Sequence, residues 1–149
     1  MISAIVPFKE EHHDRLADIW YRAVLYTHHF LAEEDLHFYE RIVRGGALRE
    51  VEIWTALNEA QEPAGFIGLD GWKIEMLFVD PEYHGQGVGS RLIRYAETLK
   101  GGTLRVDVNE QNDGACAFYA RLGFVRIGRS ERDPSGRPYP LLHLERMSG

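Results

Sequence analysis

The feature that most constrains this chain is a glycine-rich segment, His84-Gly85-Gln86-Gly87-Val88-Gly89-Ser90. Residues 72–79, just before it, have the length and β-rich composition of a strand that stops at Pro81. After it, apolar residues recur at helical spacing up to a Gly101-Gly102 pair. A strand, a glycine loop and a helix in this order direct backbone N–H groups and the positive helix end to one point. We expect a phosphate group to bind there, although a plain turn is the alternative for a glycine cluster alone.

Two well-known phosphate-binding patterns do not match this segment. The P-loop needs a lysine followed by serine or threonine after its last glycine, and here Ser90 follows Gly89 directly. The dinucleotide fingerprint needs two residues before its third glycine, and here only Val88 separates Gly87 from Gly89. The loop therefore predicts a phosphate-bearing ligand of another class.

The rest of the chain alternates between helical and β-rich patterns without an internal repeat or a linker. Helical spacing is found around residues 16–24, 33–43, 88–99 and 115–122, and β-rich runs lie at residues 2–6, 51–57, 64–69, 72–79, 104–108, 124–130 and 139–144. Short turn-rich segments separate the three runs between residues 51 and 79, which indicates consecutive antiparallel strands. We expect one mixed α/β (α+β) domain over residues 1–149.

Composition and charge narrow the possible environments and partners. The formal charge of −6 repels nucleic-acid backbones, so we expect no nucleic-acid partner. The single cysteine, Cys116, cannot form an intramolecular disulfide, and neither a signal peptide nor an apolar run of membrane-spanning length is present. We therefore expect a cytoplasmic protein without a membrane partner. The seven histidines and one cysteine show no zinc-type spacing, and we expect no metal.

Two motifs resemble the GNAT superfamily of acetyltransferases. Residues 77–89 resemble its motif A, in which Arg/Gln-x-x-Gly-x-Gly/Ala follows a strand that ends in a Val-Asp-Pro-like step. One position departs, because His84 stands where the motif has Arg or Gln. Asn112, Tyr119 and the following Leu122-Gly123-Phe124 resemble the second motif of the family, at the proper separation. The resemblance covers nearly the whole chain, and within the superfamily the chain looks like a group of small bacterial members.

The resemblance implies a fold and an activity. The fold is a mixed, mostly antiparallel central sheet of about seven strands, with about four helices packed on both faces. The activity is that of an N-acetyltransferase, which moves the acetyl group of acetyl-CoA directly to an amine acceptor. A second possibility is a non-catalytic acyl-CoA-binding sensor or partner module. A third, a toxin that acetylates charged tRNA, would require a basic cluster such as Arg44, Arg49, Arg126 and Arg132.

The same resemblance assigns the cofactor-binding residues. Backbone groups of Gly85, Gln86, Gly87, Val88, Gly89 and Ser90 are expected to bind the pyrophosphate of CoA. The main chain of Leu77, Phe78 and Val79 is expected to pair with the pantetheine arm like an added strand, and an N–H around Leu77 to stabilise the oxyanion. Asn112 is expected to contact CoA, although an asparagine at a helix start is also a common N-cap.

Tyr119 occupies the position of the family's general acid. A CoA thiolate resembles a cysteine thiolate, with a pKa of about 8.5 against about 10 for tyrosine, so a phenol can protonate it. The alternative is that Tyr119 is a core residue, because it shares a helical face with Ala115 and Leu122.

The general base is left open between three choices. Asp107 lies on a strand whose apolar side carries Leu104, Val106 and Val108, and it precedes Asn112 by five residues. Glu75 lies on the strand that leads into the glycine loop. Some family members carry a catalytic acid near each of these two positions, and water is the third choice.

The amine acceptor itself cannot be read from the pattern. His28, Phe30 and Tyr139 are expected to line its cleft, because the family's acceptor site adjoins the end of the first long helix. A histidine near a helix C-terminus is also favoured by the helix dipole alone. We expect a small-molecule or peptide amine, and a homodimer is possible because family members often pair.

Overall fold

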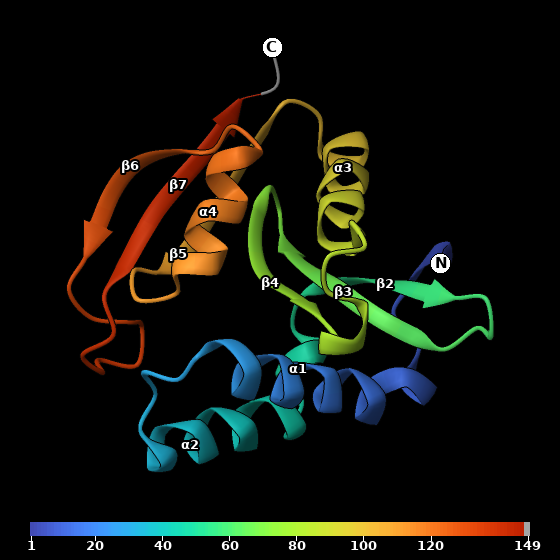
Figure 1. Cartoon of the computed structure of the whole chain (residues 1–149), viewed down its shortest axis with the longest axis horizontal. Helices are drawn as coiled ribbons and strands as arrows, with labels where there is room; N and C mark the ends of the chain where they lie inside the picture. Colours follow the sequence, from blue (N-terminus) through green and yellow to red (C-terminus); the bar gives the residue numbers. More distant parts are fainter. Residues whose placement is uncertain (148–149) are drawn as a thin grey trace.

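A computed structural model describes residues 1–147 of the chain (Figure 1). Over these residues seven strands form one sheet in the order β1-β2-β3-β4-β5-β7-β6. The strands are β1 (Ile2–Pro7), β2 (Glu52–Asn58), β3 (Pro63–Asp70), β4 (Lys73–Val79), β5 (Thr103–Asn109), β6 (Val125–Ser130) and β7 (Leu141–Met147). The helices are α1 (His13–Thr27), α2 (Glu33–Arg44), α3 (Val88–Lys100) and α4 (Asp113–Arg121), with three short 3₁₀ turns. Every strand pair is antiparallel except β4 with β5.

The helices cover both faces of the sheet, as expected from the family resemblance. One core lies beneath α3 and α4 and contains Leu92, Ile93 and the strand residues Leu104 and Val106. The other core joins α1 to the opposite face through Leu16 and neighbouring apolar residues. The β3 strand is buried from Pro63 to Leu69 because it lies between the two helical layers. The α/β fold class predicted from the sequence is confirmed.

The parallel strands β4 and β5 part soon after they begin. Their register contains the pairs Lys73–Arg105 and Ile74–Val106. Beyond this point β4 stays paired with β3 as far as Val79, and β5 stays paired with β7 as far as Asn109. Over the described residues, the β5-facing edge of β4 therefore has no strand partner from residue 75 onward, and the Val79 carbonyl is contacted instead by the His84 side chain. We call this opening the fork between β4 and β5.

A register shift adds to the divergence of β4. Met76 pairs with Gly68 and Ile74 pairs with Leu69, so Glu75 is an extra residue on β4. An extra residue of this kind is a β-bulge, which bends its strand and increases the local twist. The bulge lies at the narrow end of the fork, and the glycine loop lies beyond its wide end.

A buried carboxylate ties α1 to the start of the glycine loop. Asp80 is fully buried and accepts hydrogen bonds from Arg15 at 2.9 Å, from Arg22 at 2.8 Å and from the Glu82 backbone N–H at 3.1 Å. A buried charge is stable only when it is paired and hydrogen-bonded in this way. The Val-Asp-Pro step of the motif thus fixes the position of α1 relative to the loop.

The largest difference from the predicted boundaries is found in the last hairpin. Residues 139–144 were expected to form its second arm, but β7 begins at Leu141. Tyr139 instead belongs to the β6–β7 loop, where its hydroxyl accepts a hydrogen bond from the Ala32 N–H and donates one to Asp35. These contacts to α2 and its N-cap turn the chain away from the sheet.

Candidate functional site

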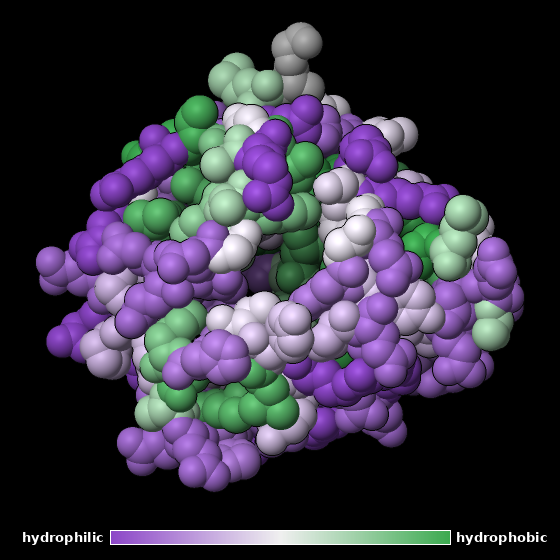
Figure 2. Space-filling model, viewed as in Figure 1, coloured by the Kyte–Doolittle hydropathy of each residue, from purple (hydrophilic) through white to green (hydrophobic). Residues whose placement is uncertain are grey.

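A cleft of about 610 Å³ lies where α1, the wide end of the fork, the glycine loop and α4 meet. Figure 2, which has the same view as Figure 1, shows a hollow near the centre of the molecule, with apolar side chains at its floor. The lining residues that the sequence predicted are His28, Leu77, Phe78, Val79, Gly85, Gly87, Val88, Gly89, Ser90, Asn112 and Tyr119. A concave, mainly apolar site of this size is typical of small-molecule binding.

The glycine loop has the geometry of an anion cradle. Gly85 and Gly87 have φ angles of +77° and +78°, which favour glycine, and a Cβ on either would meet no heavy atom of the described chain within 4 Å. The first bond of α3 runs from the Arg91 N–H to the Gly87 carbonyl, so the N–H groups of residues 88–90 have no partner inside the helix. Open space and N–H donors at a helix N-terminus therefore fit a phosphate group.

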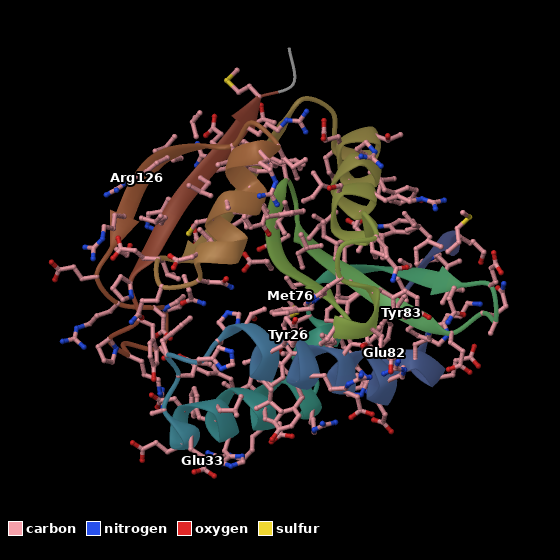
Figure 3. All side chains as sticks on the ribbon, in the orientation of Figure 1. Tyr26, Glu33, Met76, Glu82, Tyr83 and Arg126 are labelled. Atoms are coloured by element: carbon pink, nitrogen blue, oxygen red, sulfur yellow. The ribbon has the colours of Figure 1, made fainter. Side chains whose placement is uncertain are left out.

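Two polar side chains of the loop, those of His84 and Gln86, hydrogen-bond to carbonyl oxygens of the protein. His84, at the Arg/Gln position of the motif, lies with Nε2 3.1 Å from the Val79 carbonyl oxygen. Its ring contacts the edge of Tyr26 on α1, and Figure 3 labels this tyrosine beside the cleft. Gln86 donates to the Glu82 carbonyl at 3.2 Å and is not among the lining residues. The loop thus presents its backbone to the cleft.

Tyr119 is both a core residue and a residue of the cleft wall. Its ring packs at right angles to Phe118 and Phe124, and only 6% of the residue is exposed. Tyr119 also lines the cleft. Burial raises the pKa of its phenol far above the ordinary value, because the low-dielectric surroundings disfavour the phenolate. The phenol therefore keeps its proton throughout the physiological pH range.

His28 and Asn112 join α1 to α4 across the cleft. The Asn112 Oδ1 atom accepts a hydrogen bond from the Ala115 N–H at 3.0 Å, which leaves its Nδ2 facing His28 Nε2 at 3.5 Å. Thr27 donates its hydroxyl to the Ala23 carbonyl, so the His28 Nδ1–H must donate to Thr27 Oγ1 at 2.7 Å. Burial, helped by the charge of His29, lowers the pKa of His28 to about 4. His28 is thus a neutral imidazole that keeps its Nε2 lone pair.

The two candidate bases lie at the narrow end of the fork and not in the cleft. Asp107 is the first residue of β5 beyond the last β4–β5 pair, and Glu75 is the bulged residue of β4. The Asp107 carboxylate lies 3.0 Å from Lys73 Nζ and 2.6 Å from His143 Nδ1, whereas Glu75 lies 3.5 Å from Lys73. Burial works to raise the pKa of Asp107, but the bonds from His143 and Lys73 outweigh burial and lower it.

The aromatic residues expected at the acceptor site form a continuous row. Phe30 contacts His28 with ring centroids 5.2 Å apart and Tyr139 with centroids 5.9 Å apart. The row leads from the cleft to the β6–β7 loop, where Arg137 donates to Asp35 at 2.7 Å. Phe30 and Tyr139 do not line the cleft itself.

A family model described as an acetyltransferase (GNAT) domain matches residues 26–126. The chain belongs to the GNAT acetyltransferase family. This match confirms the resemblance inferred from the glycine loop and from the Asn112 and Tyr119 motif.

Similar proteins support the same assignment. The chain is 42% identical, over 144 residues, to the peptidyl-lysine N-acetyltransferase YjaB of Escherichia coli, with 97% of each chain covered. It is 43% identical over 136 residues to the protein of the same name from Salmonella typhimurium, with 91% of this chain and 92% of the other covered. The solution structure of apo YjaB from Escherichia coli superposes with a TM-score of 0.92 over the whole of both chains at 40% identity.

A more distant solved structure shares the fold. The PaiA N-acetyltransferase of Thermoplasma acidophilum, solved in complex with coenzyme A, has a TM-score of 0.73 at 20% identity, with 97% of this chain and 99% of that chain covered. Together with the family match, these relatives confirm the expected activity of this GNAT protein, an acetyl-CoA-dependent N-acetyltransferase.

The structure adds cleft residues that the sequence reasoning did not assign. They are Ala23, Tyr26, Thr27, Tyr83, His84, Gly114, Ala115, Phe118 and Arg121. Tyr26 lies on α1 and Tyr83 on the turn before the glycine loop, and Figure 3 labels both. Only the helical spacing of Arg121 from Phe118 signals that both could share a face of α4.

Two expected absences concern metals and membranes. Among residues 1–147, no group of three or more His, Cys, Asp or Glu side chains is placed to hold a metal ion. In the same part of the chain no helix has the length and apolar character needed to cross a bilayer.

Proposed function

We propose that this GNAT protein acetylates the side-chain amine of a lysine in a peptide, with acetyl-CoA held in the fork between β4 and β5. The main support for this proposal is that the fork, the glycine cradle and Tyr119 all adjoin one cleft. The names of the relatives at 42% and 43% identity support the class of acceptor.

The cofactor would be bound mainly by the backbone. The N–H groups at the start of α3 and the loop from Gly85 to Gly89 receive the pyrophosphate, and Gly85 and Gly87 supply the room for it. The unpaired edge of β4 from Leu77 to Val79 pairs with the amide groups of the pantetheine arm, as in other cases of strand addition. Arg121 at the cleft offers a cation for a further phosphate group.

This arrangement delivers the thioester toward the narrow end of the fork. An arm that enters at the glycine loop and follows β4 points to the place where Ile74 and Val106 pair. A backbone N–H around Leu77 then donates to the carbonyl oxygen of the thioester as negative charge develops on it. Tyr119 protonates the departing sulfur, because its raised pKa keeps the phenolic proton in place.

The contacts favour Asp107 over Glu75 as the base. Asp107 is held by two partners, which fix the direction of its carboxylate. Glu75 contacts Lys73 at 3.5 Å, a looser pair that leaves its carboxylate free to rotate. We assign Glu75 to holding Lys73 and Asp107 to accepting the proton of the amine.

The acceptor would approach along the aromatic row of His28, Phe30 and Tyr139. The methylene stem of a lysine suits aromatic walls, and its ammonium suits the carboxylates at the fork. The neutral imidazole of His28 has an accepting Nε2 whose long 3.5 Å contact with Asn112 Nδ2 an N–H of the incoming chain can replace.

The test is release of CoA thiol from acetyl-CoA with a panel of amines: lysine-containing peptides blocked at the N-terminus, the same peptides with a free N-terminus, polyamines and free amino acids. Blocked lysine peptides should release thiol fastest, and mass spectrometry should find the acetyl group on the lysine. Binding of acetyl-CoA without amine-dependent release from any acceptor would instead support a non-catalytic acyl-CoA-binding module.

A further inference from the structure

A row of polar side chains crosses the sheet beside the narrow end of the fork. Asp107 on β5 lies 2.6 Å from His143 on β7, and His143 Nε2 lies 2.7 Å from the Ser130 hydroxyl on β6. Lys73 on β4 lies 3.0 Å from the other oxygen of Asp107. His143 is none of the residues predicted from the sequence, and the proposed mechanism gives it no part beyond its contact with Asp107.

The strand register explains why these side chains meet. Asp107 and His143 are direct partners in the β5–β7 pairing, and His143 is the direct partner of Gly128 in the β6–β7 pairing. The imidazole lies so close to Gly128 that a Cβ on this glycine would be only 3.3 Å from the ring Cδ2. The missing side chain lets the ring reach Ser130, which is two residues further along β6.

The hydrogen bonds define the tautomer of His143. An ionised carboxylate can only accept, so the short contact with Asp107 Oδ1 requires a proton on Nδ1 of the imidazole. In the neutral ring, Nε2 then accepts the hydroxyl proton of Ser130. Asp107 thus fixes the tautomer and the Ser130 hydroxyl matches it by donating to Nε2, while His143 in turn fixes the carboxylate, as outer partners do for catalytic groups.

We propose that His143 is a positioning residue for acetyl transfer, which occupies Oδ1 of Asp107 and thereby directs Oδ2 toward the acceptor amine. This inference rests on the proposed function, in which Asp107 is the base. Lys73 is 41% exposed and occupies Oδ2 in the absence of an acceptor. The incoming ammonium takes its place there, while Lys73 remains beside Glu75.

The proton balance of the step is complete. The ammonium gives one proton to Asp107 Oδ2, and the free amine forms a bond to the acetyl carbon. The electron pair of the breaking C–S bond goes to sulfur, which takes the proton of Tyr119. The second proton of the attacking nitrogen restores Tyr119, and Asp107 releases its proton to water. One acetylated amine, one CoA thiol and one proton are formed.

The test compares His143→Asn and His143→Leu with the wild-type enzyme. Asparagine keeps an N–H donor near the place of Nδ1 but cannot titrate, whereas leucine removes the donor. His143→Leu should lower kcat by ~10-fold to 10²-fold with little change in the KM for acetyl-CoA. His143→Asn should recover most of that loss, because its amide N–H can still hold Oδ1 of Asp107.

A matched control is His37→Asn on α2, since His37 is exposed and contacts only Glu33 and Glu40 among the ion pairs of residues 1–147. Its kcat and its KM for acetyl-CoA should match those of the wild type.

Three outcomes separate this inference from the proposed function. If wild-type protein releases no thiol with any amine, the proposed function and the role of His143 both fail. If the wild type is active and His143→Leu keeps the wild-type kcat, or His143→Asn recovers none of the loss, only the role of His143 is overturned. In the unliganded protein, NMR of the imidazole nitrogens should find the neutral ring protonated on Nδ1. The opposite tautomer would also overturn the inference, whatever the activity and even if His143→Leu fails to fold.

Discussion

At the residue scale, the site depends on side chains whose chemistry is set by burial. Tyr119 is enclosed by Phe118 and Phe124, and His28 is enclosed at the end of α1. Burial disfavours the charged form of each, so it raises the pKa of the phenol and lowers that of the imidazole. Both side chains are therefore neutral near pH 7, one as a proton donor and the other as an acceptor.

Tyr119→Phe tests the role of the phenol as general acid. The variant keeps the ring and its packing but removes the hydroxyl, so kcat should fall by ~10²-fold or more with little change in acetyl-CoA affinity. Steady-state kinetics with the best peptide and titration of both proteins with acetyl-CoA measure the two effects.

The leaving group provides a check on that assignment. An acyl donor with a more acidic thiol should restore part of the rate lost in Tyr119→Phe, because its thiolate needs less protonation to depart. Equal single-turnover rates for variant and wild type would remove Tyr119 from the role of acid and leave water as the donor.

The lowered pKa of His28 predicts a loss of stability in acid. The folded protein holds this histidine at a pKa of about 4 against 6.5 for an ordinary histidine, so unfolding takes up a proton between these values. The contribution of neutral His28 to the free energy of unfolding is complete above pH 6.5 and decreases as the pH falls toward 4. Between pH 7 and pH 5 the loss amounts to about 2 kcal/mol of unfolding free energy.

Urea unfolding of wild type and of His28→Gln at pH 7 and at pH 5 measures this contribution. The variant should lose less stability over the interval, by up to that amount. His37→Gln, at an exposed site on α2, is the control and should follow the wild type. An identical pH dependence in His28→Gln would show that His28 is charged in the folded state near pH 5.

At the element scale, the glycine loop and the fork offer backbone groups to two different parts of acetyl-CoA. The loop supplies N–H groups at the start of α3, and the β4 edge supplies a second set of backbone groups. The buried ion pairs of Asp80 with Arg15 and Arg22 attach the start of the loop to α1. Backbone groups on anchored elements bind without loss of side-chain entropy on association.

Gly87→Val tests the cradle as an element. Gly87 has a φ of +78°, so a branched residue is strained there, and its side chain projects into the space that the pyrophosphate would occupy. The dissociation constant of acetyl-CoA should rise by ~10²-fold or beyond detection in calorimetry.

Gly71→Val separates backbone strain from loss of the cradle. Gly71 also has a positive φ, at +60°, and open space around its Cβ position, but it lies in the β3–β4 turn outside the cleft. This variant should lose stability to a similar degree and still bind acetyl-CoA like the wild type. An unchanged dissociation constant in Gly87→Val would contradict the assignment of the cradle.

At the scale of the whole molecule, ion pairs with acidic side chains neutralise arginines that could otherwise form a basic surface. The basic cluster that a tRNA-acetylating protein would need does not form among residues 1–147. Arg44 is paired with Asp18 and Glu40, and Arg49 is paired with Glu10. Arg126 lies on β6, far from α2 in Figure 3. With a formal charge of −6, this surface favours a small or cationic acceptor over a nucleic acid.

Ligand-dependent thermal stability tests the whole binding site. Acetyl-CoA at about 100 times its dissociation constant should stabilise the protein by about 2.7 kcal/mol, or by roughly 5–10 °C in Tm for a chain of this size. NAD and ATP should have much smaller effects, because the loop has neither of their binding patterns. A shift with ATP equal to that with acetyl-CoA would count against the assignment.

The sequence alone determined the order of elements, the glycine loop and the alternation of β5. These features depend on local spacing: a 3.6-residue or two-residue period identifies the buried side of an element, and glycines mark positive φ. The same local logic located Tyr119 and Asn112 on one helix, and the resulting family assignment and fold class are confirmed.

Only the tertiary structure decided which polar groups are partners. His28 meets Asn112 across 84 residues, His143 meets Asp107 across 36, and Tyr139 meets Asp35 across 104. From the sequence, Asp107 and Glu75 were equivalent strand carboxylates. The register of β5 with β7 places His143 beside Asp107, Lys73 on β4 is the second partner of Asp107, and the register of β4 with β3 leaves Glu75 in a bulge. The protonation and direction of a side chain depend on its neighbours in space, and strand pairing over long separations brings those neighbours together.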